Sequence, residues 1–438
     1  MKFASNFAYA KEIGFSDVEF KVQTNKKLKI ETFHRKVEKY VISENSAIYL
    51  RGIINGNLVS GYTEDKKNIN DILDTMKKHS TLIECKKAQK IFEGSAKYHR
   101  LKKQHSNLAE VPVNKKIDFC FELEDEVRKA SNLVVEVETS YNENLESLEI
   151  YNSHGLNLSY KNTYAYVFAE VVASKDKDTR TGFEVKITDD FDSFDAKALA
   201  AKAVDKAVKS LGGIQCASKK YKILLTQDVF ASFVNAFVRQ ASGDAVNKQK
   251  TLLASKLHQK VGSSKLTISE DPFVNEYPFM ARNFDDEGVA TYKKDIVKNG
   301  VLETFLYNIE AAMEAKREST GNGYGGSNIG ISTAFLRVKP GKRNEDELLK
   351  FVNNGVKITS LQGMHSGFNP ISGDFSLQAA GFLIENGKIT TPLNLITVAG
   401  NMYKMFEDIQ ALGNDVELSL GGVLTPSVVV KNLAISGK

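Results

Sequence analysis

The residues that most often bind a catalytic metal are spaced too widely in this chain to predict a metal site. A zinc hydrolase commonly uses two histidines one helical turn apart and keeps one coordination position open for water. The histidines here are His34, His79, His99, His105, His154, His258 and His365. No two of them are four residues apart. We therefore expect no zinc site in this chain, since one would need ligands from distant segments.

A polar cluster at Met364–Ser376 contains residues that could act as an acid and a base. His365, Asp374 and Ser376 could act together in hydrolysis, with Ser366 and Asn369 beside them. The same residue types also cap turns and accept backbone hydrogen bonds, which is their commoner role. The sequence has no GxSxG elbow, so a serine nucleophile is not indicated.

A glycine-rich segment at 321–327 resembles a phosphate-binding loop only in composition. It lacks the lysine of a Walker loop and the GxGxxG register. Its members with candidate roles are Gly323, Gly325, Gly326, Ser327 and, just beyond, Asn328. Two interpretations stay open: a tight turn between strands, or a place where a peptide backbone approaches closely.

The elements around these segments predict an α+β protein in three parts. An α+β unit at 1–85 is followed by a basic linker at 86–110 and by a second α+β unit at 111–213. The clearest helix, 193–211, closes that unit at a double glycine. Residues 220–438 alternate short apolar runs with turn signals, which predicts a large antiparallel β-rich domain, barrel-like or sandwich-like.

Local patterns predict individual elements within these parts. A helix is expected at 119–135 and a strand at 47–54. The pairs Asn55-Gly56, Asn299-Gly300 and Asn386-Gly387 indicate turns between strands. The acidic turn at 285–288 lacks the spacing of a calcium loop, so a structural role is expected there.

Composition argues for a soluble protein of a reducing compartment. The net charge is only +5, from 59 basic and 54 acidic residues, so direct nucleic-acid binding is not expected. The basic stretch 86–103 is interpreted as a solvated linker, or else as a patch for an acidic partner. Cys85, Cys120 and Cys216 are far apart and predict no disulfide. With no apolar run long enough for a membrane and no secretory leader, a cytoplasmic location is expected.

Taken in order, short motifs of the last 220 residues resemble the TldD/PmbA family, also known as the modulator of DNA gyrase family. Each motif alone is weak, but their order and spacing together are specific. They are Ser242–Val246, Leu266–Ile268, Asp271–Pro272, Phe284–Val289, Ser319–Gly321, Gly326–Asn328, His365–Asn369, Ser372–Ser376, Pro392, Ala399–Asn401, Gly413–Asp415 and Pro426–Ser427. A weaker match covers Leu50–Gly52 and Asn152–Gly155.

The resemblance also indicates which branch of the family is involved. TldD-type chains carry a zinc-binding HExxxH helix and a later cysteine ligand. Aligning that helix through Asp244 places Val234, Asn235 and Arg239 where the motif has histidine, glutamate and histidine. The last cysteine here is Cys216, which precedes the helix. Valine has no lone pair and arginine is a permanent cation, so this chain resembles the TldE (PmbA) side, without the metal site.

The resemblance implies a noncatalytic subunit of a heterodimeric TldD/TldE protease that processes unfolded peptides. Zinc is then expected on the TldD-type partner, with no cofactor in this chain and no peptidase activity of the chain alone. The glycine-rich segment and the His365–Ser376 segment would line the peptide channel or the subunit interface. Two alternatives stay open. One is a stand-alone homodimeric peptide-binding or gyrase-modulating protein, and the other is a hydrolase that uses an unrecognised site such as His365 with Asp374.

Overall fold

The computed structural model describes residues 2–82, 90–102 and 104–438, which fold into two compact units. The sheet unit comprises Met1–Val208, Phe273–Thr291 and Asn308–Gly330. The barrel unit comprises Lys209–Pro272, Tyr292–Tyr307 and Ile331–Lys438. The sheet unit therefore recruits two segments from the second half of the chain. Cys85 and residues 86–89 and 103 of the basic stretch lie outside the described residues, and the three-part division of the sequence stays a prediction.

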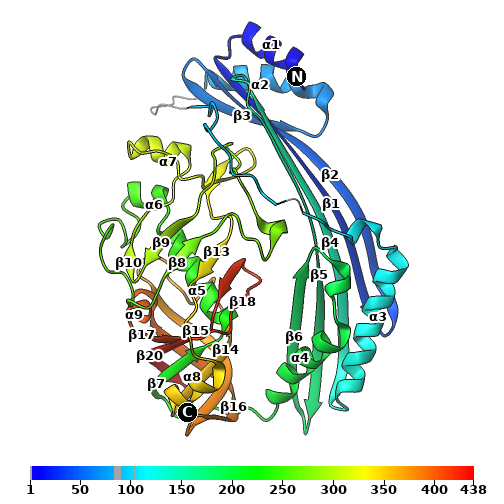
Figure 1. Cartoon of the computed structure of the whole chain (residues 1–438), viewed down its shortest axis with the longest axis vertical. Helices are drawn as coiled ribbons and strands as arrows, with labels where there is room; N and C mark the ends of the chain where they lie inside the picture. The colour runs from blue at the N-terminus through cyan, green and yellow to red at the C-terminus, as the bar shows by residue number, and fades with distance from the viewer. Residues whose placement is uncertain (1, 83–89, 103) are drawn as a thin grey trace. The chain divides into compact units, whose positions relative to one another are not determined.

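Six antiparallel strands in the order β3-β2-β1-β4-β5-β6 form the sheet of the sheet unit (Figure 1). They are β1 (Asp17–Phe33), β2 (Lys36–Ile54), β3 (Asn57–Thr63), β4 (Val134–Asn152), β5 (Asn157–Lys175) and β6 (Asp178–Thr188). Asn55 and Gly56 both have positive φ, 52° and 77°, and join β2 to β3. Two consecutive residues of positive φ match the right-handed twist of a hairpin, as the Asn-Gly pair predicted.

The sheet unit also contains helices. They are α1 (Ala4–Glu12), α2 (Ile69–Ser80), α3 (Val113–Ala130), α4 (Ala196–Lys209) and α7 (Ile309–Glu314), with short 3-10 turns at Lys66–Asn68, Leu108–Glu110, Phe191–Ser193 and Pro278–Met280. α1 and α2 bury Phe20, Leu50 and Leu73 in one core cluster. The bounds predicted for the helix at 119–135 were wrong. Helix α3 begins at Val113 and ends at Ala130, and β4 already begins at Val134. Val134 and Val135 are β-branched, which favours a strand.

A closed barrel of five strands forms the barrel unit, because β16 pairs with both β15 and β20. Its strands are β7 (Lys219–Leu225), β14 (Gly355–Gln362), β15 (Asp374–Glu385), β16 (Lys388–Asn401) and β20 (Val428–Ser436), with β17 (Ile409–Leu412) beside β20. The pairs are antiparallel except β7 with β14. Asn386 and Gly387 form the β15–β16 turn in the left-handed region. The α+β class with a large β-rich C-terminal part is thus confirmed.

A second sheet and four helices complete the barrel unit. The sheet contains β8 (Ile268–Glu270), β9 (Lys294–Lys298), β10 (Val301–Leu302), β13 (Leu336–Val338), β18 (Glu417–Leu418) and β19 (Val423–Thr425). The helices are α5 (Gln227–Gln240), α6 (Gly243–Asn247), α8 (Glu345–Val352) and α9 (Met402–Glu407). Phe237 of α5 packs on Phe406 of α9, with ring centroids 4.9 Å apart. None of the helices in the described ranges is both long and apolar enough to cross a membrane.

Asn344 stabilises the start of α8 and gives a first testable prediction. Its side chain accepts a hydrogen bond from Glu347 N, and the Glu347 carboxylate accepts one from Asn344 N, both at 2.9 Å. We expect Asn344→Ala to lower the free energy of unfolding by about 1 kcal/mol, because one end of this capping box is lost. Denaturant unfolding followed by circular dichroism measures this loss. An unchanged midpoint would contradict it.

Candidate functional site

Val234 and Arg239, the two positions that the resemblance aligns with zinc-binding histidines, lie on different faces of α5. Val234 is fully buried in the core, whereas Arg239 is exposed. Five residues turn an α-helix through about 500°, so these two side chains point about 140° apart. Asn235 donates from its amide to the carbonyl oxygen of Gly421 at 3.2 Å. An alkyl group, a guanidinium and an amide already engaged with backbone do not fit a zinc ion.

The histidines, cysteines and carboxylates elsewhere form no comparable cluster. In residues 2–82, 90–102 and 104–438, no three such side chains are grouped closely enough to hold a metal ion. Cys120 and Cys216 are buried free thiols. Burial raises the pKa of Cys120 to about 12, against a lowering by the hydrogen bond to Thr139. A thiol with so high a pKa is a poor nucleophile at neutral pH.

The His365–Ser376 segment forms the turn that leads into β15. The side-chain oxygen of Asn369 accepts hydrogen bonds from Ile371 N and Ser372 N, at 3.0 and 3.2 Å. Asp374 accepts from the Asn401 amide at 2.9 Å, and this hydrogen bond lowers the pKa of Asp374. Over the described residues, no hydrogen bond or ion pair joins Asp374 to His365. The acidic and amide side chains of this segment therefore support the turn.

The other predicted residues of this segment have backbone or local contacts. Ser376 donates its N–H to Gly367 O at 2.8 Å. The Ser366 hydroxyl donates to Gly363 O at 3.4 Å. Ser376 and His365 are both exposed, so both side chains are open to a ligand.

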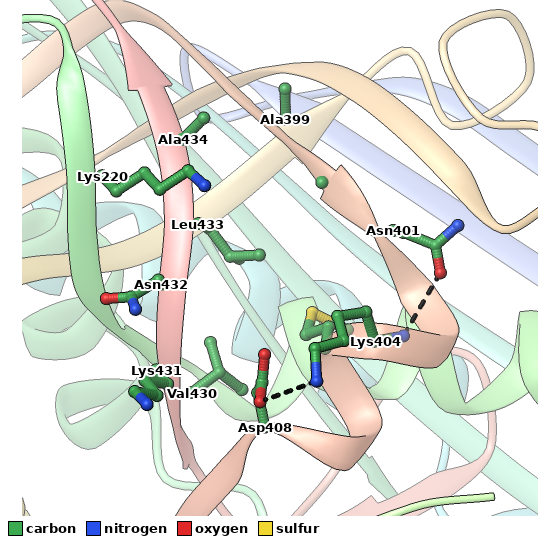
Figure 2. A pocket seen from close by; sticks show the side chains of 12 residues that line it. Lys220, Ala399, Asn401, Lys404, Asp408, Val430, Lys431, Asn432, Leu433 and Ala434 are labelled. Atoms are coloured by element: carbon green, nitrogen blue, oxygen red, sulfur yellow. Dashed lines mark hydrogen bonds and ion pairs between the residues drawn. The ribbon is translucent and has the colours of Figure 1, made fainter.

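A pocket of about 310 Å³ lies next to this turn and shares Asn401 with it (Figure 2). Its lining comes from β7, β16, α9 and β20, and includes apolar residues such as Val430 and Leu433. Three lysines border it: Lys220, Lys404 and Lys431. Lys404 forms ion pairs with Glu407 and Asp408, both at 3.3 Å. An apolar lining with cationic groups at the border suits a small group that carries a negative charge.

Sequence reasoning missed these lysines because they come from three separate elements. Lys431 lies where β20 departs from regular pairing, between Val430 and Leu433. Such a β-bulge re-aims side chains and is common beside functional sites. A bulge leaves no residue signature in a strand as apolar as Val428–Val430, so the pocket could not be predicted from the sequence.

The glycine-rich segment belongs to the sheet unit, where the acidic turn 285–288 holds it. β11 (Gly323–Gly325) pairs with β12 (Ile329–Ile331). Gly323 N donates to Asp285 Oδ2 at 2.8 Å, and Gly325 N donates to Asp286 Oδ2 at 2.9 Å. A Cβ atom at Gly323 would collide with the Glu287 carboxylate. Glycine is therefore required where this strand approaches the acidic turn.

The remaining members of this segment are placed differently. Gly326 lies against the ring of Tyr49, which leaves no space for a side chain there. Ser327 and Asn328 follow in the connection from β11 to β12, where Ser327 is half-buried and Asn328 is exposed. The glycine-rich segment and the His365–Ser376 segment are thus in different units, the first in the sheet unit and the second in the barrel unit.

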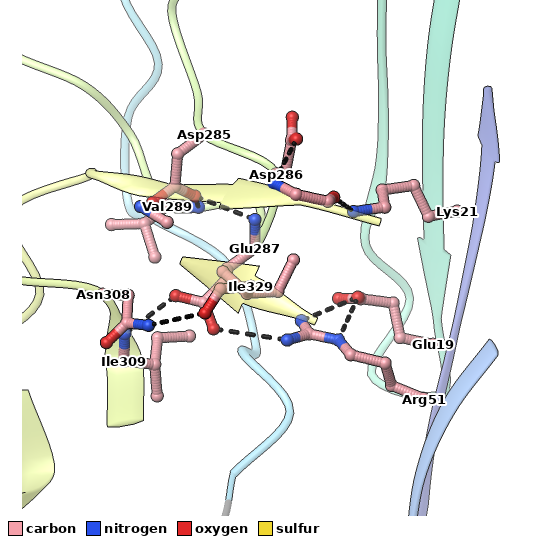
Figure 3. Close-up of polar contacts among 12 residues, drawn as sticks. Glu19, Lys21, Arg51, Asp285, Asp286, Glu287, Val289, Asn308, Ile309 and Ile329 are labelled. Carbon is pink, nitrogen blue, oxygen red and sulfur yellow. Dashed lines mark hydrogen bonds and ion pairs between the residues drawn. The ribbon is translucent and has the colours of Figure 1, made fainter. Parts of the chain in front are cut away.

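Beneath the glycine-rich segment lies a buried charge cluster, which consists of Glu19, Lys21, Arg51 and Glu287 (Figure 3). Arg51 donates to Glu19 Oε1 through Nε at 3.0 Å and Nη2 at 2.8 Å. Its Nη1 also donates to Glu287 Oε1 at 3.3 Å. Glu287 in turn accepts from the backbone of Ile309 at 2.8 Å. Burial alone would lower the pKa of Arg51, but the two carboxylates raise it above its ordinary value.

Lys21 completes the buried charge cluster from β1. Its ammonium group donates to the carbonyl oxygen of Gly325. Burial lowers the pKa of Lys21, partly offset by the negative charge of Asp286. The cluster therefore ties β1 and β2 to both segments that the sheet unit recruits from the second half of the chain. Its function is to fix the backbone of the glycine-rich segment.

Two family models match the chain. One, described as the PmbA/TldA metallopeptidase C-terminal domain, matches residues 218–437. The other, described as the PmbA/TldA metallopeptidase central domain, matches residues 106–211.

Curated relatives agree with these models. A PmbA metalloprotease homolog from Buchnera aphidicola of Acyrthosiphon pisum is 30% identical over 287 residues, which are 65% of this chain and 62% of the relative. The match thus spans less than two thirds of that relative. A second homolog, from Buchnera aphidicola of Baizongia pistaciae, is 30% identical over 74% of this chain and 71% of its own length. The metalloprotease PmbA of Escherichia coli O157:H7 is 27% identical over 74% of this chain and 71% of its own length.

Solved structures share the whole fold. A Thermotoga maritima protein with a suggested role as a modulator of a DNA gyrase superposes with a TM-score of 0.92, at 27% identity over 99% of both chains. TldE from Thermococcus kodakarensis gives a TM-score of 0.91 at 21% identity over the full length of both chains. At 21% identity, the likeness to TldE from Thermococcus kodakarensis shows a shared fold alone.

Proposed function

This chain belongs to the PmbA/TldE-type metallopeptidase family, and we propose that it is a noncatalytic subunit that works with a zinc-binding TldD-type partner. The complex would process unstructured peptides. The observation that carries this proposal is the donor set on α5. Val234, Asn235 and Arg239 stand at the aligned motif positions, one buried in the core and one exposed to solvent. The two positions aligned with the histidines carry an alkyl group and a permanent cation, and neither can donate a lone pair to zinc.

The contribution of this chain would then be to bind peptide and to assemble the complex. The pocket beside Asn401 supports a peptide role, because its apolar lining and bordering lysines suit a peptide group of negative charge. The glycine-rich segment would contribute through Ser327 and Asn328, of which the first is half-buried and the second exposed. Both follow backbone that the acidic turn holds at Gly323 and Gly325.

Peptide cleavage by the separate and the mixed subunits tests this proposal. We expect the pure chain to bind no stoichiometric zinc and to cleave an unstructured peptide no faster than buffer does. Addition of a TldD-type chain from the same organism should start cleavage, and a chelator should stop it. Either zinc at one equivalent or cleavage by the pure chain would contradict the noncatalytic role.

A matched variant separates this proposal from a hydrolase that uses His365. If the chain had its own acid–base site, His365→Ala would abolish cleavage by the pure chain, and a chelator would not affect that cleavage. The noncatalytic role instead predicts no cleavage to abolish. In the mixture, His365→Ala would change the KM more than the kcat, because a residue of the channel contacts peptide away from the reacting bond.

A gyrase-related role is the second candidate, favoured only by the role suggested for the Thermotoga maritima protein. Direct action on DNA fits poorly with a net charge of +5 over 438 residues. Binding of a short DNA duplex at low salt, with a steep loss on addition of salt, would favour this candidate over the peptidase role.

A further inference from the structure

The pocket beside Asn401 lies where β20 changes its partner strand. On one side, β20 pairs with β17 at residues 428–430 and with β16 at residues 434–436. Over the described residues, no strand pairs with that side of β20 at 431–433. The pocket is thus a gap in the strand pairing, with a volume of about 310 Å³. Ligand pockets have volumes of about 300–1,000 Å³, so this one suits a single small group.

The interior of the pocket is apolar and its entrance is positively charged. Met405, Val430 and Leu433 line it and are only 1%, 1% and 5% exposed. The three lysines of the pocket are exposed to solvent. Figure 2 shows Lys220 and Lys404 on either side of Leu433. A ligand that fits has an apolar part, which enters the pocket, and a negative charge, which stays beside the lysines.

Two of the lysines are available to such a ligand. Lys404 forms ion pairs with Glu407 and Asp408. Asp408 is the one carboxylate among the described residues that line the pocket. In the part of the chain that the structure describes, neither Lys220 nor Lys431 forms an ion pair. The pocket therefore presents two cations that have no counter-ion.

These lysines suit a carboxylate better than a phosphate group. Phosphate sites usually contain arginine or free backbone N–H groups at the start of a helix. No arginine is among the described residues of the lining. The start of α9 is already occupied, because Asn401 accepts hydrogen bonds from Tyr403 N and Lys404 N at 3.1 and 3.2 Å. The remaining cations are ammonium groups, which bind a carboxylate as point charges.

We propose that the pocket binds the C-terminal residue of a peptide, with an apolar side chain inside and the free carboxylate beside Lys220 and Lys431. The choice of a peptide as the ligand rests on the proposed function. An internal aspartate or glutamate fits less well, because its charge is at the tip of the side chain and would enter the apolar interior first. At a C-terminus the side chain and the carboxylate diverge from one carbon atom, so each reaches its own region. The exposed amide of Asn432 has a donor and an acceptor for the last peptide bond.

Isothermal titration calorimetry with the full-length chain alone tests the class of ligand. Acetyl-glycyl-leucine, which has a free carboxylate, should bind. Its C-terminal amide should bind about 10-fold more weakly, because two ion pairs with exposed lysines are lost. Acetyl-glycyl-glycine should also bind at least about 10-fold more weakly, because it has no apolar side chain to bury. The free acid 4-methylpentanoate, which has no peptide bond, should bind more weakly than acetyl-glycyl-leucine, and inorganic phosphate should not compete.

Lysine variants test the position of the carboxylate. The double variant Lys220→Gln with Lys431→Gln should weaken binding of acetyl-glycyl-leucine about 10-fold and leave binding of its amide unchanged. Lys219→Gln is the matched control. Lys219 is the neighbour of Lys220 on β7, where successive side chains point to opposite faces, and its ammonium group lies 4.9 Å from the centre of the Tyr221 ring. This control should bind both dipeptides as the natural sequence does. Because all three lysines are exposed, circular dichroism should show both variants folded.

Several outcomes would overturn this assignment of the pocket. They are no binding of acetyl-glycyl-leucine, equal binding of the acid and the amide, competition by phosphate, equally tight binding of 4-methylpentanoate, and an unchanged affinity in the double variant. None of these measurements needs a partner chain. Cleavage by the mixed subunits without dipeptide binding would therefore overturn this inference alone. Dipeptide binding without such cleavage would contradict the proposed subunit role and leave the pocket as a peptide site.

Discussion

Arg51→Ala should lower the free energy of unfolding of the sheet unit by about 3–5 kcal/mol, because it leaves two buried carboxylates without their counter-ion. Arg51 is 6% exposed, Glu19 1% and Glu287 4%. The Glu19 Oε2 atom already has no hydrogen-bond partner in the described structure. Without the guanidinium, each carboxylate must take up a proton or admit water. Denaturant unfolding followed by circular dichroism at neutral pH measures the loss.

A surface arginine of the same unit is the control. Arg35 pairs with Asp125 at an exposed position, with 56% of its side chain accessible. Arg35→Ala should cost less than about 1 kcal/mol, since an exposed ion pair is screened by water. If the two variants lost equal stability, the buried charge cluster would not hold the sheet unit together in the way described.

Asp285→Ala should destabilise the same unit by about 3 kcal/mol or more, because one buried side chain serves three backbone donors. Glu287 N and Val289 N donate to Asp285 Oδ1 at 3.0 and 2.9 Å, and Gly323 N donates to Oδ2. Each backbone N–H left unpaired in the interior costs about 1–3 kcal/mol. Amide hydrogen exchange gives a local measurement: Gly323 N–H should exchange much faster in the variant, while the amides of β20 stay protected.

The pH dependence of Asp285→Asn provides a second measurement on the same residue. Burial and the neighbouring Glu287 carboxylate raise the pKa of Asp285 in the folded chain, against the opposing effect of the three N–H donors. The unfolded chain therefore loses this proton first as the pH rises. The contribution of Asp285 to stability is full below its unfolded pKa of about 3.9 and declines above it. The stability difference between the natural sequence and Asp285→Asn should thus shrink between pH 4 and pH 7. A difference that grows would contradict the raised pKa.

The turns of this fold could be predicted from sequence because single residues determine them. Asn55-Gly56, Asn299-Gly300 and Asn386-Gly387 each have two consecutive positive φ values. Few other dipeptides adopt such a turn, so each pair locates a hairpin by itself. The helix predicted at 193–211 was found as α4 for a similar reason: Asp195 accepts a hydrogen bond from Ala198 N at 2.9 Å.

The extent of the long strands could not be predicted in this way. The sequence indicated a strand at 47–54, whereas β2 begins at Lys36. Residues 36–46 are exposed on both faces, except half-buried Ser43, so no alternation of apolar and polar side chains marks them as a strand. These residues form a strand only because they pair with β1. A strand specified only by its neighbour carries little local signal.

The candidate sites show the same difference between local patterns, which can be predicted, and contacts between distant segments, which cannot. The prediction that Val234, Asn235 and Arg239 stand in place of a zinc motif could be made from the sequence, because a helix motif is a local pattern. The ion pair between Arg51 and Glu287 joins residues 236 positions apart, and no pattern within either segment indicates it. The acidic turn at 285–288 was interpreted as structural from its spacing. Its hydrogen bonds to the glycine-rich segment could not be predicted, because the two segments are brought together only by the fold.

The two segments that the sheet unit takes from beyond residue 272 have a consequence during synthesis. The strands of the sheet have all been synthesised once β6 ends at Thr188. Two of their partners are synthesised much later. Glu287 pairs with Arg51, and Phe284 packs on Leu148 and Ile150. At about 5–20 residues per second, the nascent sheet waits on the order of ten seconds for Gly330. During that interval Arg51 has only Glu19 as a partner, and the nascent chain is most vulnerable to aggregation and to chaperone capture.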